Sequence, residues 1–197
     1  MCTDDIECHP WQPYIPQNAR IFILGTFPPA PSRWSMEFYY PNRINDFWRI
    51  MGLIFFNDKE ALFDANAKRF KLDEITRLLD NRGIALGDTA AEIRRLKGNA
   101  SDKFLEILKP IDLRAALSKM PQCSAIATTG EKAAGVIASI TDTQIPEKGG
   151  MVSGFCPGID RQLSIFRMPS TSRAYPLPLE KKADYYISMF RKVGILN

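Results

Sequence analysis

The sequence predicts a three-layer α/β/α sandwich around a central, mostly parallel sheet of four strands. Three observations lead to this fold class. Short apolar runs recur along the 197 residues and each ends in a turn, stretches with helical spacing separate these runs, and no internal repeat or long linker divides the chain. Strands that alternate with helices are typical of a parallel sheet with helices on both faces. We therefore expect one domain that spans residues 1–197.

The first half of the chain is expected to supply an arm, two strands and two helices. Residues 1–18 contain three prolines and little periodicity, which predicts an extended arm on the surface. RIFILG, at 20–25, is a continuous apolar run, as in a strand that is buried on both faces. Apolar residues recur at helical spacing in 44–56 and 72–83, which predicts two helices, the second closed by a glycine. A short strand is predicted at 84–88.

The second half of the chain is expected to hold four helices and two strands. Ser101 is a good N-cap, and the residues after it predict a helix over 101–109. Apolar runs that end in Thr/Gly and Pro/Ser/Thr turns predict strands within 124–130 and 162–172. The remaining predicted helices are 112–119, 131–140 and 179–193.

The composition excludes several classes of protein. Hydrophobic residues make up 45% of the chain and charged residues 24%, both ordinary for a soluble globular domain. No stretch is apolar enough to span a bilayer, and the N-terminus has acidic residues where a secretory signal peptide carries basic ones. We therefore expect a cytoplasmic, monomeric protein. A net charge of +4 permits a nucleic-acid partner but does not establish one.

The four cysteines and the single histidine give no sign of a metal site. The cysteines are scattered without a C-x-x-C pair, so in a reducing compartment we expect free thiols and no metal. His9 lies in the proline-rich arm, where we interpret it as a packing or solvent-exposed residue rather than a catalytic one.

The loops GTFPP, GDT, TTGEK and MPSTS each follow a predicted strand. In a parallel sheet the carboxyl ends of the strands form the usual ligand site, so the convergence of these loops is the best indication of a site. Each loop alone is explained as well by a tight turn or a helix cap. The chain has no G-x-x-x-x-G-K-[ST], G-x-S-x-G or G-x-G-x-x-G pattern, which argues against a P-loop hydrolase, a serine triad and a nicotinamide cofactor. No cofactor is expected.

Residues 38–48, FYYPNRINDFW, bring aromatic rings and amides into one short stretch. Rings stack on flat ligands, and an amide presents a donor and an acceptor together, which suits the edge of a nucleobase. The hydroxyls of MPSTS suit a phosphate. This combination fits an enzyme that flips a base out of DNA and holds it in a pocket. Phe47 and Trp48 are explained equally well as core residues.

Four stretches resemble the motifs of a known family. ILGTFPP at 23–29 ends in G-x-x-P, and YYPNRINDFWRIMG at 39–52 places an aromatic before an Asn-x-Phe-Trp stretch. GIALGDTAAEIRRLKGNASD at 83–102 puts an Asp at a strand end, and MPSTSRAY at 168–175 contains a Pro-Ser-Thr-Ser turn. In this order and spacing the chain resembles the uracil-DNA glycosylase superfamily, and it is most similar to the hypoxanthine-DNA and mismatch-specific glycosylase branches. The match spans nearly the whole chain after residue 20.

The resemblance implies a single uracil-DNA glycosylase-like domain that acts on damaged or mismatched DNA, duplex or single-stranded. The implied activity is that of a monofunctional DNA glycosylase of base excision repair, which removes hypoxanthine or uracil by hydrolysis of the N-glycosidic bond without a cofactor. Two departures leave alternatives open, because Phe27 stands where most members have Asp or Asn and Met168 where many have His. The chain is therefore also explained as a catalytically inactive member of the fold that binds nucleic acid or a nucleotide. A glycosylase that acts on free nucleosides or RNA is a second alternative, which does not depend on these departures.

The resemblance also implies roles for individual residues. Asn45 is the implied catalytic amide and Asn42 the second candidate, while Asp88 either assists catalysis or caps a helix at 89–95. Tyr40 matches the aromatic that stacks on the base. The rest of the implied base pocket is Gly25, Thr26, Phe27 and Pro28, and the implied contacts to DNA phosphates are Ser170, Thr171, Ser172 and Arg173. No lysine is placed for a Schiff base, so no lyase activity is expected.

Overall fold

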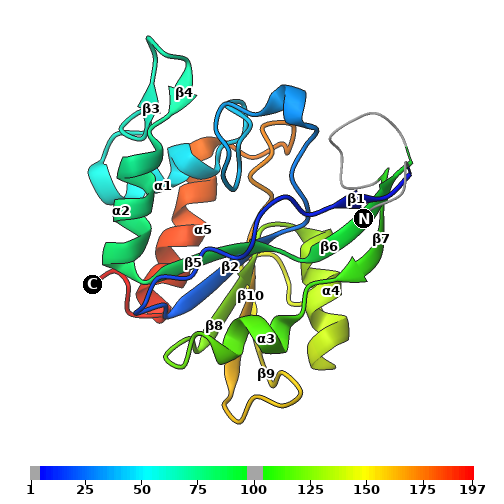
Figure 1. Ribbon diagram of the computed structural model, residues 1–197. Coiled ribbons are helices and arrows are strands. Elements are labelled where there is room, and N and C mark those ends of the chain that lie inside the picture. The colour runs from blue at the N-terminus through cyan, green and yellow to red at the C-terminus, as the bar shows by residue number, and fades with distance from the viewer. Residues whose placement is uncertain (1–4, 97–103) are drawn as a thin grey trace.

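A computed structural model describes residues 5–96 and 104–197. Its centre is a five-stranded sheet in the order β5-β2-β8-β10-β9 (Figure 1). Four parallel strands lie at the predicted places: β2 (Ile21–Gly25), β5 (Ile84–Asp88), β8 (Ala125–Thr128) and β10 (Leu163–Arg167). The fifth strand, β9 (Met151–Gly154), pairs antiparallel with β10 at the edge. The predicted fold class is confirmed, with one edge strand added.

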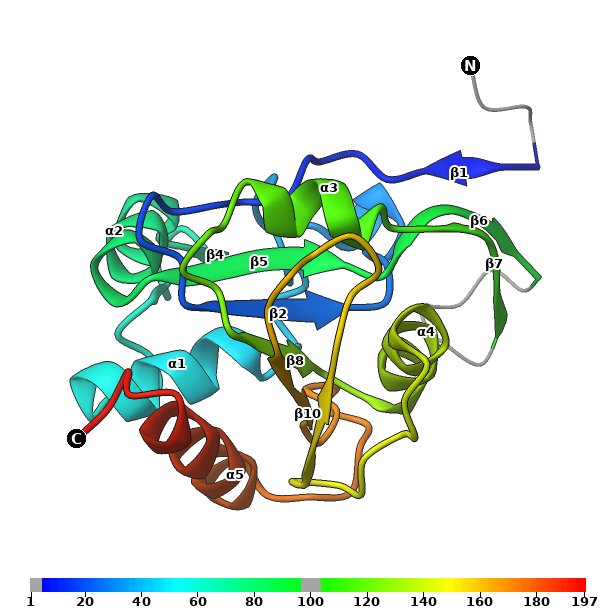
Figure 2. The same ribbon diagram turned by 90° about the horizontal axis from the view of Figure 1, so that it is seen from below.

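Helices cover both faces of this sheet (Figure 2). One face packs against α1 (Phe47–Phe56), α2 (Leu72–Arg82) and α5 (Leu179–Lys192), and the other against α3 (Leu113–Ser118) and α4 (Glu131–Thr141). In β2, Ile21 and Ile23 belong to the first core and Phe22 and Leu24 to the second. This strand therefore needs apolar side chains at successive positions, which explains its continuous apolar run.

A second sheet takes the place of one predicted helix. Its order is β1-β6-β7, and its antiparallel strands are β1 (Glu7–Cys8), β6 (Ala90–Arg95) and β7 (Leu105–Pro110). The helix expected over 101–109 is wrong in its described part, because Ile107 pairs with Ile93 of β6. Its expected N-cap, Ser101, lies outside the described residues. The interpretation of Asp88 as the cap of a helix at 89–95 is wrong because that segment is β6.

The N-terminal segment runs along the edges of both sheets. β1 pairs with β6, and the backbone of Tyr14 forms an antiparallel bridge with Leu86 of the edge strand β5. Cys8 is disulfide-bonded, so the expectation of four free thiols is wrong, while Cys123 and Cys156 are free and buried.

Two small elements complete the described chain. A 3-10 turn, η1 (Pro31–Arg33), lies in the proline-rich loop after β2, and the hairpin of β3 (Phe63–Asp64) and β4 (Arg69–Phe70) follows α1. Among residues 5–96 and 104–197, no helix has the length and hydropathy needed to span a membrane.

Candidate active site at the carboxyl edge of the sheet

The carboxyl ends of the four parallel strands meet at one edge of the central sheet. Gly25 of β2 lies opposite Asp88 of β5, and Leu24 lies opposite Thr128 of β8. Thr128 in turn lies opposite Arg167 of β10. The loops that follow these strands therefore leave the sheet side by side, and they contain most of the residues that the sequence suggested for a site.

Gly25 lets two functional side chains approach the backbone of β2. A Cβ at position 25 would collide with Asp88 Oδ1 and would lie 3.3 Å from Tyr40 Oη. Tyr40 reaches this point from the loop before α1, with a left-handed backbone (φ 52°). Its ring stacks on Phe47 with centroids 3.8 Å apart, and its hydroxyl lies 3.0 Å from Thr129 Oγ1. The site thus combines a flat ring, a carboxyl group and a bare stretch of backbone.

Asp88 lies within hydrogen-bond distance of His9 of the N-terminal segment. His9 Nε2 lies 2.9 Å from Asp88 Oδ2, and the two side chains are only 10% and 9% exposed. The imidazole packs among the rings of Trp11, Phe27 and Tyr39. The packing role expected for His9 is therefore present, but the sequence gave no indication of its pairing with a carboxyl group 79 residues away.

The second ring nitrogen of His9 contacts the backbone of Trp11. Nδ1 lies 2.7 Å from the Trp11 carbonyl oxygen and 3.1 Å from the Trp11 amide nitrogen. A protonated imidazole, or the neutral tautomer with its proton on Nε2, donates to an ionised Asp88. The neutral tautomer with its proton on Nδ1 instead requires Asp88 to hold the proton. The pair can therefore pass one proton between its members, which is what acid–base catalysis requires.

The environment of Asp88 favours its protonated form. Burial raises the pKa of this carboxyl group above its usual value, while the hydrogen bond and the charge of His9 act in the opposite direction. A carboxyl group with a raised pKa at the ligand-binding edge of a sheet is a candidate for acid–base work. In the described part of the chain, no group of three or more His, Cys, Asp or Glu side chains could hold a metal ion.

Asn45 is attached to the loop that follows β10. Its backbone forms a bridge with Ser172, and the N–H of Asp46 donates to the Thr171 carbonyl at 2.9 Å. The side-chain oxygen of Asn45 accepts the N–H of Phe47 at 2.9 Å, at the start of α1. Because this oxygen is engaged, the NH₂ group is the part of the carboxamide suited to contact a ligand.

A buried lysine that the sequence analysis missed joins the same loop to α1. Lys182 Nζ lies 2.8 Å from Asp46 Oδ2 and 2.8 Å from the Ser172 carbonyl, and its side chain is 1% exposed. Arg173 Nε contacts the other oxygen of Asp46 at 3.3 Å. The sequence did contain a signal, because Lys182 lies one turn before the buried Tyr186 on the apolar face of α5. A charge at such a position needs a buried partner.

The residues suggested for phosphate contacts differ in their exposure. Thr171 is buried and Ser170 half-buried, whereas Ser172 and Arg173 are exposed. The last two are therefore the members of this group that could meet a DNA strand.

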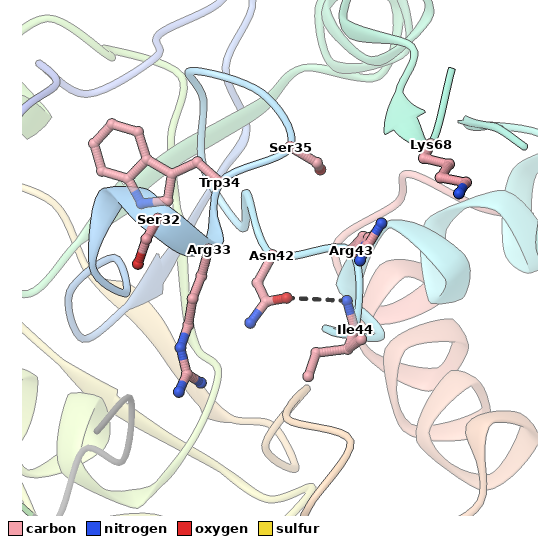
Figure 3. A pocket seen from close by; sticks show the side chains of 8 residues that line it. All are labelled: Ser32, Arg33, Trp34, Ser35, Asn42, Arg43, Ile44 and Lys68. Carbon is pink, nitrogen blue, oxygen red and sulfur yellow. Dashed lines mark hydrogen bonds between the residues drawn. The ribbon is translucent and has the colours of Figure 1, made fainter. Parts of the chain in front are cut away.

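Asn42 lies in a different environment from Asp88. It lines a cavity of about 500 Å³ whose walls include neither Gly25, Tyr40 nor Asp88 (Figure 3). Its side-chain oxygen accepts the N–H of Ile44 at 3.1 Å. Of the two asparagines, Asn45 is thus the one joined to the loop after β10.

Comparison with known proteins identifies the fold. No protein-family model and no curated protein matches the chain. Among solved structures, it is similar to a protein from Methanosarcina acetivorans whose solution NMR structure is described as that of a "putative Uracil DNA glycosylase", with a TM-score of 0.63 over 96% of this chain and 99% of the other. The two chains share a fold. Their sequence identity is 19%, so the activity has to be argued from the residues of this site.

Proposed function

We propose that the protein is a monofunctional DNA glycosylase that removes a deaminated base, hypoxanthine or uracil, by hydrolysis of the N-glycosidic bond in base excision repair. The proposal rests on one observation: Tyr40, Asp88 and the bare backbone of Gly25 converge at the carboxyl edge of a sheet whose fold is shared with the Methanosarcina protein. His9 completes this group by its contact with Asp88.

Tyr40 is suited to hold a flipped base. One face of its ring stacks on Phe47, and we assign the opposite face to the base. The bond between its hydroxyl and Thr129 fixes the direction of the ring. The backbone after Gly25 and the NH₂ group of Asn45 would then read the edge of the base through hydrogen bonds.

Asp88 and His9 are suited to activate water. As the C1′–N bond breaks, the sugar gains oxocarbenium character and the base leaves with the electron pair, later taking a proton from solvent. Water forms the new bond to C1′ and gives its proton to the ionised form of Asp88, which the hydrogen bond from His9 Nε2 favours. This pair would supply the polar function that Phe27 cannot. General-base assistance of this kind typically contributes about 10²–10⁴-fold in rate.

The buried lysine supports hydrolysis without lyase chemistry. A Schiff-base lysine needs a free, neutral amine that can reach the sugar. The Lys182 ammonium is instead bonded to the Asp46 carboxylate and the Ser172 carbonyl, where its role is to hold the loop.

The second candidate is a catalytically inactive member of the fold that binds nucleic acid or a nucleotide. Two observations favour it. Met168 is 1% exposed and offers no hydrogen-bond donor at the end of β10. His9 also covers one oxygen of Asp88, the group that would otherwise face a water molecule.

A base-release assay separates the two candidates. Duplex and single-stranded oligonucleotides would contain uracil, hypoxanthine, xanthine or a G·T mismatch, and hot alkali would cut the strand at abasic sites. We expect wild type to cut at one lesion, and Asp88→Asn and Asn45→Ala to lose about 10²-fold or more of the rate while they still bind DNA. Asn81→Ala, a change at an exposed position of α2, is the matched control. A folded wild type that binds DNA and cuts none of these substrates would favour the second candidate.

A further inference from the structure

A second potential binding site, which the proposed function does not use, is the 500 Å³ cavity that Asn42 lines. Its walls come from η1 and the residues after it, from the loop before α1, and from the turn of the β3–β4 hairpin. Three cations line it: Arg33, Arg43 and Lys68 (Figure 3). We call it the basic cavity. Its volume lies within the range of about 300–1,000 Å³ that is usual for small-molecule sites.

The charge of the basic cavity favours an anion. No acidic side chain lines it, and within the described residues Arg33, Arg43 and Lys68 form no ion pair. By contrast Arg49, in the adjoining helix α1, pairs with Glu60 at 3.1 Å. Three like charges around one space repel one another, and an anion between them removes this cost.

Contacts that do not involve the charged groups of Arg33, Arg43 and Lys68 hold two walls of the basic cavity in place. Arg49 donates a hydrogen bond to the carbonyl oxygen of Arg43 and lies over the ring of Phe63, 4.9 Å from its centroid. One residue of α1 therefore fixes both the segment that contains Arg43 and the hairpin whose turn contains Lys68. A cavity with fixed walls pays less conformational entropy when a ligand binds.

The rest of the lining suits the other parts of a nucleotide. Trp34 offers a flat ring whose orientation is fixed by a bond from Nε1 to the Pro29 carbonyl at 2.7 Å. Ile44 is an exposed apolar side chain that also lines the cavity. The Asn42 side chain lies between Arg33 and Ile44 in Figure 3, and because its oxygen accepts the N–H of Ile44, its NH₂ group can donate to a ligand. Cations beside a flat ring match a phosphate with its attached sugar and base.

We propose that the basic cavity binds a nucleotide phosphate, and that this phosphate belongs to a DNA strand whose neighbouring nucleotide occupies the candidate active site. Both of its main walls continue into that site, because Ile44 directly precedes Asn45 and Pro31 follows the GTFPP loop. The choice of DNA as the source rests on the proposed function. A free mononucleotide offers the same chemistry and is the other source that the test has to distinguish.

Binding of undamaged DNA tests the basic cavity without the use of base release. The dissociation constant of a labelled single-stranded oligonucleotide would be measured by fluorescence anisotropy, over a range of salt concentrations, for Arg33→Ala, Arg43→Ala, Lys68→Ala and the triple variant. Each single change should weaken binding about three- to tenfold, as expected for one solvent-exposed charge contact. Because the three cations are assigned to one phosphate, the triple variant should reduce the steepness of the log–log salt dependence by about 0.7, the value for one phosphate on a single strand, and each single variant should reduce it by less.

A matched control distinguishes a specific effect of the basic cavity from an effect of the overall positive charge of the protein. Lys119→Ala removes one exposed charge at the end of α3, on the opposite face of the sheet, and should change neither affinity nor salt slope. Because Arg33, Arg43 and Lys68 are exposed, their variants should melt at the temperature of wild type.

Calorimetry with dAMP and with inorganic phosphate identifies the source of the phosphate. If neither binds wild type while the triple variant loses oligonucleotide affinity, the source is a DNA strand. If either compound binds wild type but not the triple variant, the phosphate site stands and the assignment to DNA is overturned. If the triple variant binds the oligonucleotide as Lys119→Ala does, and neither compound distinguishes it from wild type, the proposal as a whole is overturned. A wild type that releases no base, but whose DNA affinity depends on these cations, would remove the proposed function and keep the site.

Discussion

At position 25, the absence of a side chain is what allows Asp88 and Tyr40 to come together. A methyl group there would collide with Asp88 Oδ1 beside the Tyr40 hydroxyl. We expect Gly25→Ala to lower the free energy of unfolding by about 1–3 kcal/mol, as overpacking does, and to reduce base release. Gly135 in α4 is the matched control, because a Cβ there would only touch Ile145 Cδ1 at 3.8 Å. Gly135→Ala should stabilise the protein by about 0.5–1 kcal/mol. Urea denaturation measures both changes, and a neutral Gly25→Ala would contradict the proximity of Asp88 to β2.

Asp88 should give the stability of the protein a distinct pH dependence. Burial raises the pKa of this group in the folded protein above the unfolded value of 3.8, so folding favours the protonated carboxyl. Its contribution to the free energy of unfolding is then fully present below the unfolded pKa and is lost as the pH rises through the folded pKa. Asp88→Asn does not titrate, so the stability of wild type relative to this variant should fall as the pH rises from about 4. Urea denaturation at a series of pH values measures this difference. A constant difference would mean that His9 fully compensates the buried charge.

At the scale of single elements, α5 fastens the loop after β10 through Lys182. Removing one member of a buried ion pair leaves the other charge without compensation, which typically costs about 3–5 kcal/mol. Lys182→Met should therefore lower the free energy of unfolding by an amount of this order, although Arg173 still contacts Asp46. The neighbouring Lys181 is the control, because its pair with Asp184 is exposed and Lys181→Met should change stability by less than about 0.5 kcal/mol. Equal effects of the two changes in thermal unfolding would show that the buried pair does not hold the loop.

The sequence predicts correctly those elements whose pattern of apolar residues fits only one kind of secondary structure. RIFILG is apolar at successive positions because β2 faces two cores, and helix periodicity does not produce such a run. LEILKP is ambiguous, because leucine, isoleucine and glutamate suit a helix by propensity, and only the pairing of Ile107 with Ile93 makes it a strand. Such pairing depends on a partner elsewhere in the chain, which a local pattern does not contain.

In the candidate site, too, the sequence indicates some contacts between residues and gives no sign of others. That Gly25, Asp88 and the loop after β8 lie together follows from their places at the ends of parallel strands, which the sequence indicates. The contact of His9 with Asp88 depends on the path of an arm that has no periodicity and that crosses to the site from another sheet. Arm paths of this kind are set by tertiary packing alone, so the sequence left His9 as a packing residue.

At the scale of the whole molecule, the N-terminal arm links the small sheet to the carboxyl edge of the large one, where the candidate site lies. Glu7 of β1 binds Arg95 of β6 through two hydrogen bonds of 2.8 and 2.9 Å, and Arg95 also donates to the Pro28 carbonyl at 3.3 Å. The arm, β6 and the GTFPP loop are thus joined at Arg95, whose partner Glu7 lies two residues before His9 in the sequence. This linkage helps to position the imidazole over Asp88, together with the packing of the imidazole on Tyr39 of the first core.

Removal of residues 1–10 tests whether the arm acts through His9 or through its strand. If its contribution is the imidazole, the truncated protein and His9→Ala should lose base release to the same extent, by up to about 10²–10⁴-fold, because each leaves Asp88 without the hydrogen bond that favours its ionised form. Glu7→Gln weakens only a partly exposed ion pair, so it should cost at most about 1 kcal/mol of stability and should leave most of the rate. The rate of base release would be measured for all three variants in single-turnover experiments with saturating enzyme, where differences in DNA affinity do not affect the rate. A truncation that loses far more than His9→Ala would assign a separate role to the pairing of β1 with β6, and a fully active His9→Ala would mean that Asp88 handles the proton of the attacking water alone.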